Sequence, residues 1–89
     1  MKKFRDLERI VKGFSNHRRI QIMELLYKTP NLSVIEISDE LKINLKTASE
    51  HIRRLFISEL VIKRNDINFV RHNLSPRGKA ILVFLRILE

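Results

Sequence analysis

The sequence has no cysteine and no tryptophan, and only two glycines and two prolines among its 89 residues. Without cysteine there is no disulfide, no thiolate metal ligand and no cysteine nucleophile. Because glycine and proline interrupt regular backbone, their scarcity predicts a chain that lies mostly in helices and strands. Acidic residues are also few, since 10 Asp and Glu stand against 18 Lys and Arg, a net charge of +8. Such a basic excess in a small domain is typical of proteins that bind a polyanion.

Long apolar runs are missing as well. The longest, residues 80–88, is interrupted by Arg86, and at about 1.5 Å per helical residue it is too short for a hydrocarbon core of about 30 Å. The first six residues carry charges and no apolar core, unlike a signal peptide. We therefore expect no membrane partner and a cytoplasmic protein. A length of 89 residues predicts one domain, covering residues 1–89.

Hydrophobic spacing predicts helices over most of the chain. Apolar side chains recur every three or four positions in residues 4–14, which predicts an amphipathic first helix. A second helix is expected to begin near Asn16 and to end before Pro30, because the residue before a proline is pushed out of the helical region. Residues 33–36 (SVIE) predict a capping box for a third, short helix that ends at Leu41.

The next helix completes a helix-turn-helix motif. Asn44 is a suitable N-cap for a helix over residues 45 to about 58, and two helices joined by a turn of three or four residues are typical of this motif. Two segments rich in β-branched and aromatic residues follow, at 61–64 and 69–74, and they predict a β-hairpin. The Ser-Pro pair at 75–76 then suits the N-cap and first turn of a last helix.

The order of these elements defines the predicted fold class, which is mainly α with a β-hairpin wing (α+β). The order is helix, helix, helix-turn-helix, hairpin, helix, and a hairpin directly after the helix pair makes this a winged helix-turn-helix. Its expected functional parts are a recognition helix at about 45–58, a wing at about 61–74 and a C-terminal dimerisation helix at about 76–88.

Several segments resemble the winged-helix repressors of the arsenic-repressor (ArsR) type. They are the second-helix segment 19–26 (RIQIMELL), the recognition-helix segment 47–55 (TASEHIRRL) and the Leu-Val at 60–61 that leads into the wing. The segment 75–82 (SPRGKAIL) is more similar to MarR-type and archaeal winged-helix regulators. The resemblance implies a DNA-binding transcription regulator, repressor-like, that dimerises through its terminal helices.

Some positions depart from the ArsR-type pattern. Lys42 and Glu59 stand where the family has glycine, and His72 stands where a tyrosine is common. The cysteines that bind soft metals in the third helix are absent, so the resemblance does not extend to thiolate metal sensing. His17, His51 and His72 occupy unrelated positions, and we expect neither a metal site nor a cofactor. We also expect no enzyme, because no nucleophile–base pair and no glycine-rich phosphate loop is evident.

The recognition helix is expected to enter the major groove of double-stranded DNA, with its N-terminal half facing base edges. Arginines further along the helix and three cations of the hairpin are expected to contact phosphates or the minor groove. The alternatives are a merely solvated helix face and charge that protects an exposed strand edge. The predicted DNA-binding residues are Lys46, Thr47, Ser49 and Glu50 for bases, Arg53 and Arg54 for phosphates, and Lys63, Arg64 and Arg71 on the wing.

The last helix is apolar on nearly every side, whereas a surface helix of a monomer needs only one apolar stripe. The first helix offers a matching strip, so we expect a two-fold homodimer formed chiefly by the last helix, with help from the first. The alternative is a last helix that folds back and is buried within its own subunit. The predicted interface residues are Phe4, Leu7, Val11, Ile81, Phe84, Leu85 and Leu88.

A second class of function remains open, because a fold does not fix a function. Winged helices also serve as protein–protein interaction modules inside larger assemblies. The surface of the recognition helix and wing discriminates the two, since a DNA reader keeps it cationic and polar and an interaction module carries an apolar patch there. In this sequence the surface is mostly cationic, with Ile57 and the acidic Glu50 as exceptions.

Overall fold

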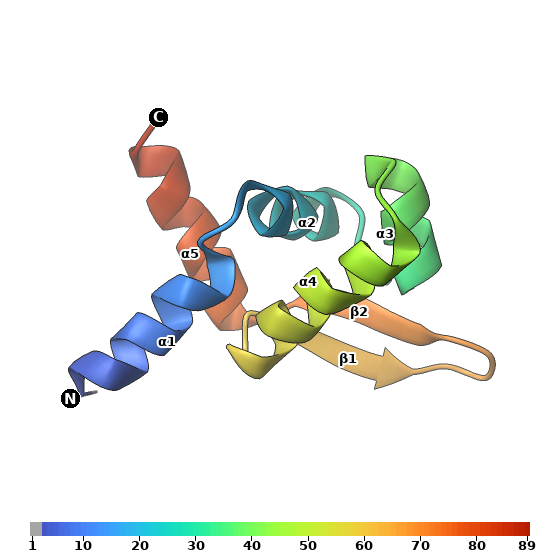
Figure 1. Ribbon diagram of the computed structural model, residues 1–89, viewed down its shortest axis with the longest axis horizontal. Helices are drawn as coiled ribbons and strands as arrows, with labels where there is room; N and C mark the ends of the chain where they lie inside the picture. The colour runs from blue at the N-terminus through green and yellow to red at the C-terminus, as the bar shows by residue number, and fades with distance from the viewer. Residues whose placement is uncertain (1–2) are drawn as a thin grey trace.

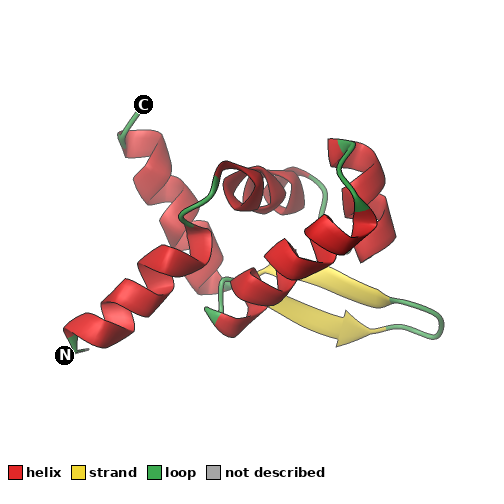
Figure 2. Cartoon of the chain, viewed as in Figure 1, coloured by secondary structure: helices red, strands yellow, loops and turns green. Residues whose placement is uncertain are grey.

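The computed structural model describes residues 3–89, which form five helices and a two-stranded antiparallel hairpin (Figure 1). This is the winged helix-turn-helix architecture expected from the sequence, mainly α with a β wing (Figure 2). The elements in chain order are α1 (Phe4–Phe14), α2 (His17–Lys28), α3 (Val34–Leu41), α4 (Leu45–Ile57), β1 (Val61–Asn65), β2 (Val70–Leu74) and α5 (Pro76–Ile87).

Short polar side chains begin four of the helices. The Asn16 side chain accepts hydrogen bonds from the first-turn amides of α2, and Asn44 does the same for α4. Ser33 accepts from the amide of Glu36 at 3.2 Å while the Glu36 carboxylate accepts from the amide of Ser33 at 2.9 Å. This is the predicted capping box, and it satisfies two donors at the helix start. Ser75 caps α5, which has Pro76 in its first turn.

The hydrophobic core lies between α2, α3, α4, the base of the hairpin and one face of α5. Ile22 and Met23 of α2 are completely buried, as are Ile37 of α3 and Leu55 of α4. Each such side chain contributes roughly 1.5–3 kcal/mol when removed from water. The buried cluster comprises Phe14, Ile22, Met23, Leu26, Ile37, Ile52, Leu55, Leu60, Val61, Leu74 and Leu82.

The hairpin is joined to the helical layer by its second strand. Val61 lies opposite Leu74, and Lys63 lies opposite His72 in the antiparallel register. His72 is buried, and its Nδ1 lies 2.9 Å from the carbonyl oxygen of Leu32. Leu32, in the segment before α3, also forms an isolated bridge with His72. The base of the wing is therefore held in place while its tip extends away from the helices (Figure 1).

Two residues adopt left-handed backbone conformations at positions where the ArsR-type pattern has glycine. Lys42 has a φ of 54° and Glu59 a φ of 60°. A non-glycine residue in this region costs roughly 1–2 kcal/mol. Both positions end a helix, and the amide of Glu59 donates to the carbonyl of Phe56 at 2.9 Å. The glycines of the ArsR-type pattern therefore correspond to a left-handed backbone conformation. This chain keeps that conformation with a lysine and a glutamate in place of glycine.

The two terminal helices lie at the end of the molecule opposite the tip of the wing (Figure 1). On α5 only one side faces the core, where Leu82 is buried and Ile81 and Leu85 pack against the core cluster. The other side leaves Phe84 and Leu88 exposed. The helix is therefore buried in its own subunit on one face and exposed on the other. No helix within residues 3–89 is long and apolar enough to span a membrane.

Candidate nucleic-acid interface

Helix α4 presents a continuous polar face to solvent. Its core side consists of Ala48, Ile52 and Leu55, which are all buried. Leu45, in the first turn of the helix, is 46% exposed. The six polar residues that the sequence singled out on this helix are all exposed, namely Lys46, Thr47, Ser49, Glu50, Arg53 and Arg54.

Glu50 holds two arginines of this face in place. Its carboxylate accepts hydrogen bonds from Arg53 at 2.7 and 3.0 Å and from Nε of Arg54 at 3.3 Å. The hydrogen bonds from Arg53, with a smaller contribution from Arg54, lower the pKa of the Glu50 carboxyl to about 2. All three side chains are exposed, so water screens these pairs. The network orients both guanidinium groups on the exposed face of α4.

The three wing cations do not form a single cluster. Alternation along a strand places neighbouring side chains on opposite faces. Lys63 lies on the face toward α4, where its ammonium stacks over the ring of Phe56 with 4.3 Å between Nζ and the centroid. Arg64 lies on the other face, directly opposite Arg71 in the register. Lys63 and Arg64 are both exposed, so solvent reaches the ammonium group of Lys63 and the guanidinium group of Arg64.

Arg71 is a structural residue of the wing. Its Nη1 lies 2.8 Å from Oε1 of Glu36 and its Nε lies 3.5 Å from Oδ2 of Asp66. Its guanidinium also stacks on the ring of Phe69 at 5.0 Å, and only 23% of the side chain is exposed. The sequence predicted a phosphate contact here, but the guanidinium is already occupied by two carboxylates. One of those carboxylates belongs to α3, so the ion pair ties the wing to the helix-turn-helix.

A second structural cation lies behind α4. This is Arg19, whose Nη1 lies 3.3 Å from Nδ1 of the His51 ring. Burial, and then the nearby Arg19 charge, lower the pKa of His51. A neutral ring that accepts at Nδ1 is consistent with this contact. The Nε of Arg19 is buried and has no hydrogen-bond partner within residues 3–89.

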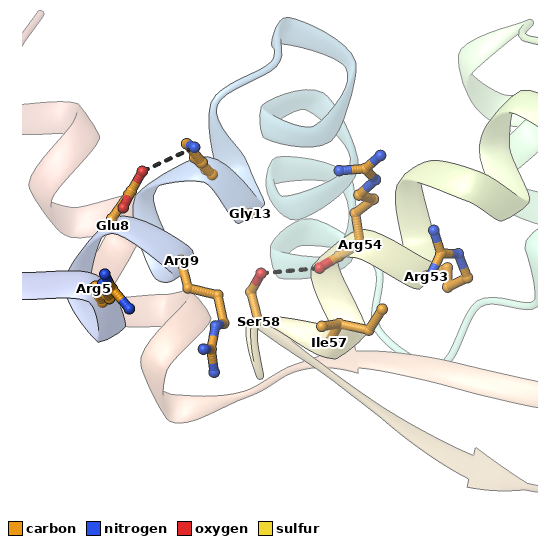
Figure 3. A pocket seen from close by; sticks show the side chains of 9 residues that line it. Arg5, Glu8, Arg9, Gly13, Arg53, Arg54, Ile57 and Ser58 are labelled. Atoms are coloured by element: carbon orange, nitrogen blue, oxygen red, sulfur yellow. Dashed lines mark hydrogen bonds and ion pairs between the residues drawn. The ribbon is translucent and has the colours of Figure 1, made fainter.

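A groove that sequence reasoning missed lies between α1 and the C-terminal half of α4 (Figure 3). It has a volume of about 560 Å³, and α1 contributes Arg5, Arg9 and Lys12 to its lining. These three cations are spaced at i, i+4 and i+7, which puts them on one face of the helix. That spacing is visible in the sequence, but the sequence does not show that α4 lies beside it.

Taken together, an exposed cationic helix in a helix-turn-helix, with a cationic wing beside it, defines a winged helix-turn-helix DNA-binding module. The comparisons with known proteins agree. A family model described as winged helix-turn-helix DNA-binding matches residues 15–55. HlyU from Vibrio cholerae is 31% identical in sequence, covers 99% of this chain and 97% of its own, and has a TM-score of 0.83. The chain therefore belongs to the family of winged helix-turn-helix transcription regulators that contains HlyU.

Two further structures illustrate the family. The transcriptional regulator HlyU from Vibrio vulnificus is 30% identical over 92% of this chain and 85% of its own, with a TM-score of 0.76. A homodimeric winged helix-turn-helix DNA-binding domain from Mycobacterium bovis, a possible ArsR-family regulator, is 26% identical over 93% and 77%, with a TM-score of 0.82. The ArsR-type resemblance of the sequence is thus confirmed, and the family consists of transcription regulators and not of enzymes. A comparison with curated protein sequences finds no match.

Proposed function

We propose that this chain is a cytoplasmic, homodimeric transcription regulator that binds specific sequences in double-stranded DNA and acts as a repressor. The observation that carries the proposal is the exposed face of α4, where every predicted DNA-binding residue of the helix is exposed to solvent. The N-terminal half of such a helix reads base edges in the major groove. Lys46, Thr47, Ser49 and Glu50 occupy that half.

The phosphate contacts are assigned to side chains around the base-reading residues. Arg53 and Arg54 follow on α4, and Glu50 holds both in position. Lys63 and Arg64 reach out from the wing and act on the backbone or minor groove beside the recognition helix. Arg71 serves the same interface indirectly, because its ion pair with α3 orients the wing.

A homodimer formed by α1 and α5 fits the apolar surface that these helices leave uncovered. Exposed fractions reach 83% for Phe4, 52% for Val11, 50% for Phe84 and 65% for Leu88. Ile81 and Leu85 also serve the subunit's own core, so they border this surface and do not form its centre. A two-fold axis through the terminal helices would present two recognition helices to half-sites about 34 Å apart. The homodimeric Mycobacterium bovis domain supports this assembly.

Selection of bound sequences from random duplex DNA, followed by mobility shifts at two salt concentrations, tests the proposal. We expect a near-palindromic motif and an affinity that falls steeply with salt, with a log–log slope of roughly −0.9 per phosphate contact. Lys46→Ala or Glu50→Ala should alter the selected motif, whereas Arg64→Ala should weaken all sequences alike. No enriched motif, or an affinity that is unchanged between about 50 and 200 mM salt, would contradict the proposal.

One observation favours a second candidate, a winged helix that binds another protein. At the C-terminal end of α4 the side chains of Phe56 and Ile57 are 43% and 53% exposed, and Ile62 of β1 is 49% exposed. They line a shallow cavity of about 540 Å³ between α4 and β1. An apolar patch at this place is typical of an interaction module. If the DNA selection enriches no motif, this candidate is favoured, because a protein partner could bind the apolar patch without using the cationic face of α4.

A further inference from the structure

The groove between α1 and α4 carries a strong excess of positive charge. Arg53 and Arg54, which are paired with Glu50, line it from α4. Arg5, Arg9 and Lys12 line it from α1, and the lining itself contains a single carboxylate. That carboxylate, Glu8, is already paired with Nζ of Lys12 at 2.9 Å, as the dashed line in Figure 3 shows. Within residues 3–89 neither Arg5 nor Arg9 has an ion-pair partner. The groove therefore contains two unpaired cations, Arg5 and Arg9, that can bind an external anion.

The groove continues the recognition surface of α4. Residues 46, 50, 53 and 57 follow one another at helical spacing along the exposed face, and Arg53 and Ile57 also line the groove. The C-terminal part of α4 contacts both neighbours. Phe56 lies beside the wing, where Lys63 stacks on it, whereas Ser58, the C-cap of α4, lies against Gly13 of α1. Both the wing and the cationic face of α1 therefore border the exposed face of the recognition helix.

Gly13 fixes the position of this cationic face. It is buried at the end of α1, and a Cβ added to it would lie 1.9 Å from Oγ of Ser58. The backbone of α1 therefore touches the end of α4 directly, and only glycine permits the approach. Ser58 is itself held by a hydrogen bond from its hydroxyl to the carbonyl of Arg54 at 3.0 Å. The α1 cations are consequently held at a defined place relative to the recognition helix.

We propose that the α1 face of this groove binds the phosphodiester backbone of DNA, on the edge of the major groove opposite the wing. A helix inserted in a major groove has a sugar–phosphate strand on each side. The wing reaches one strand, and Arg5, Arg9 and Lys12 are placed to reach the other. This inference rests on the proposed DNA binding. It adds a DNA contact by α1, which the proposed function uses only for dimerisation. In the two-fold dimer, this second strand lies on the side toward the symmetry axis.

The dimensions and exposure of the cations fit a polymer of phosphates. The row from Arg5 to Lys12 spans about 10 Å along a helix that rises 1.5 Å per residue, which is the axial length of about three phosphates of one strand. All the cations that line the groove are exposed. A small free anion would stay hydrated there and gain little, whereas a DNA strand positioned by the recognition helix brings several phosphates at once. Free phosphate shares the chemistry, and the experiment must separate the two sources.

The test compares two variants that lose the same charge. Arg5→Gln with Arg9→Gln removes the two unpaired groove cations, and Lys28→Gln with Lys79→Gln removes two exposed cations outside the groove. The probe is the tightest duplex from the selection experiment, titrated at several salt concentrations, after sedimentation has shown that each variant keeps the assembly of wild type. We expect the groove variant to lose roughly tenfold or more in affinity near 0.1 M salt and about 0.9 in salt slope per lost contact. The control should stay within about twofold.

A second measurement needs no variant of the protein. Neutral methylphosphonates are placed in the duplex, either on the strand toward the symmetry axis or on the strand beside the wing. Wild type should bind the first duplex more weakly than the unmodified duplex. The groove variant should lose no further affinity when its duplex carries the same methylphosphonates, and this pair of results supports the proposal.

Equal duplex affinity and equal salt slope for wild type and groove variant would overturn it while leaving the proposed function intact. Tight binding of inorganic pyrophosphate without DNA, with an unchanged duplex affinity of the variant, would assign the groove to a free anion. Absence of any duplex binding by wild type would overturn both proposals.

Discussion

Arg71 of β2 and Glu36 of α3 form an ion pair with 2.8 Å between Nη1 and Oε1, although 35 residues separate them in sequence. Glu36 also closes the capping box of α3. One carboxylate thus serves both the start of the helix-turn-helix and the orientation of the wing. The hydrogen bonds from Ser33, followed by the charge of Arg71, lower the pKa of Glu36, which keeps this carboxylate ionised in mildly acidic solution.

Arg71→Ala and Arg64→Ala should therefore differ, although each removes one cation from the wing. We expect Arg71→Ala to lower the melting temperature and to loosen the wing, because Glu36 and Asp66 lose their partner. Arg64→Ala should keep the melting temperature and reduce the salt slope of DNA binding by about 0.9 per contact. Thermal unfolding and salt titrations of both variants check this. An Arg71→Ala protein that melts like wild type and shows the slope of Arg64→Ala would make Arg71 a phosphate contact.

Gly13→Ala should destabilise the fold through a steric conflict and not through loss of a contact. The added methyl would meet Oγ of Ser58 at 1.9 Å and its Cβ at 2.4 Å. Overpacking of this kind costs about 1–3 kcal/mol. The matched variant Ser58→Gly removes both conflicting atoms, so the double variant should lose less stability than the sum of the single changes. Additive losses in denaturant titrations would show that α1 can move away from α4 without cost.

Local signals in the sequence were sufficient for most of the fold. The capping box at Ser33 and Glu36 and the N-cap at Asn44 involve residues three or fewer positions apart, so their geometry follows from local spacing. The hairpin differs only at its edges, because β1 extends to Asn65 and β2 begins at Val70.

The site was less predictable because its contacts are long-range. The sequence shows that Arg71 is a cation on a strand, but not that Glu36 lies beside it. It shows that Arg5 and Arg9 share a helix face, but not that this face borders α4. Neither relationship has a local signal, since each depends on how two distant elements pack. Which side of α5 faces the core is a third example, because residues 80–85 are all apolar.

The stability of the protein should decrease as the pH falls below about 6.5, the ordinary pKa of histidine. Burial of His72 lowers its pKa, and its hydrogen bond with the carbonyl of Leu32 opposes the shift only in part. Because the folded-state pKa is depressed, the unfolded chain takes up a proton first, and stability is lost between the unfolded and the folded pKa. His51, whose pKa is also lowered, contributes with the same sign.

Unfolding titrations at several pH values check this dependence. His72→Asn should be less stable than wild type at neutral pH and should show a smaller loss between about pH 6.5 and 5. His17→Asn is the matched control for the loss of a histidine side chain, because His17 is exposed. A His72→Asn protein with the full wild-type pH dependence would assign the effect to other groups.

The dimer can be separated from the fold by substitutions on opposite sides of α5. Phe84 and Leu88 are 50% and 65% exposed, whereas Leu82 is 3% exposed. Phe84→Glu with Leu88→Glu should therefore leave the subunit folded and convert a dimer into a monomer, as sedimentation velocity and circular dichroism would show. Leu82→Ala should instead lower the free energy of unfolding by about 2–5 kcal/mol.

DNA binding provides the functional readout of this separation. A monomer contacts one half-site, so the Phe84→Glu and Leu88→Glu protein should bind a duplex with two half-sites no better than a duplex with one. Wild type should prefer the duplex in which the half-sites are about 34 Å apart, because both recognition helices then meet major grooves on the same side of the DNA. Changing that spacing by half a turn should remove the preference. A wild-type protein that sediments as a monomer at tens of micromolar and is indifferent to spacing would contradict the dimer, and the exposed apolar faces of α1 and α5 would then require a different partner.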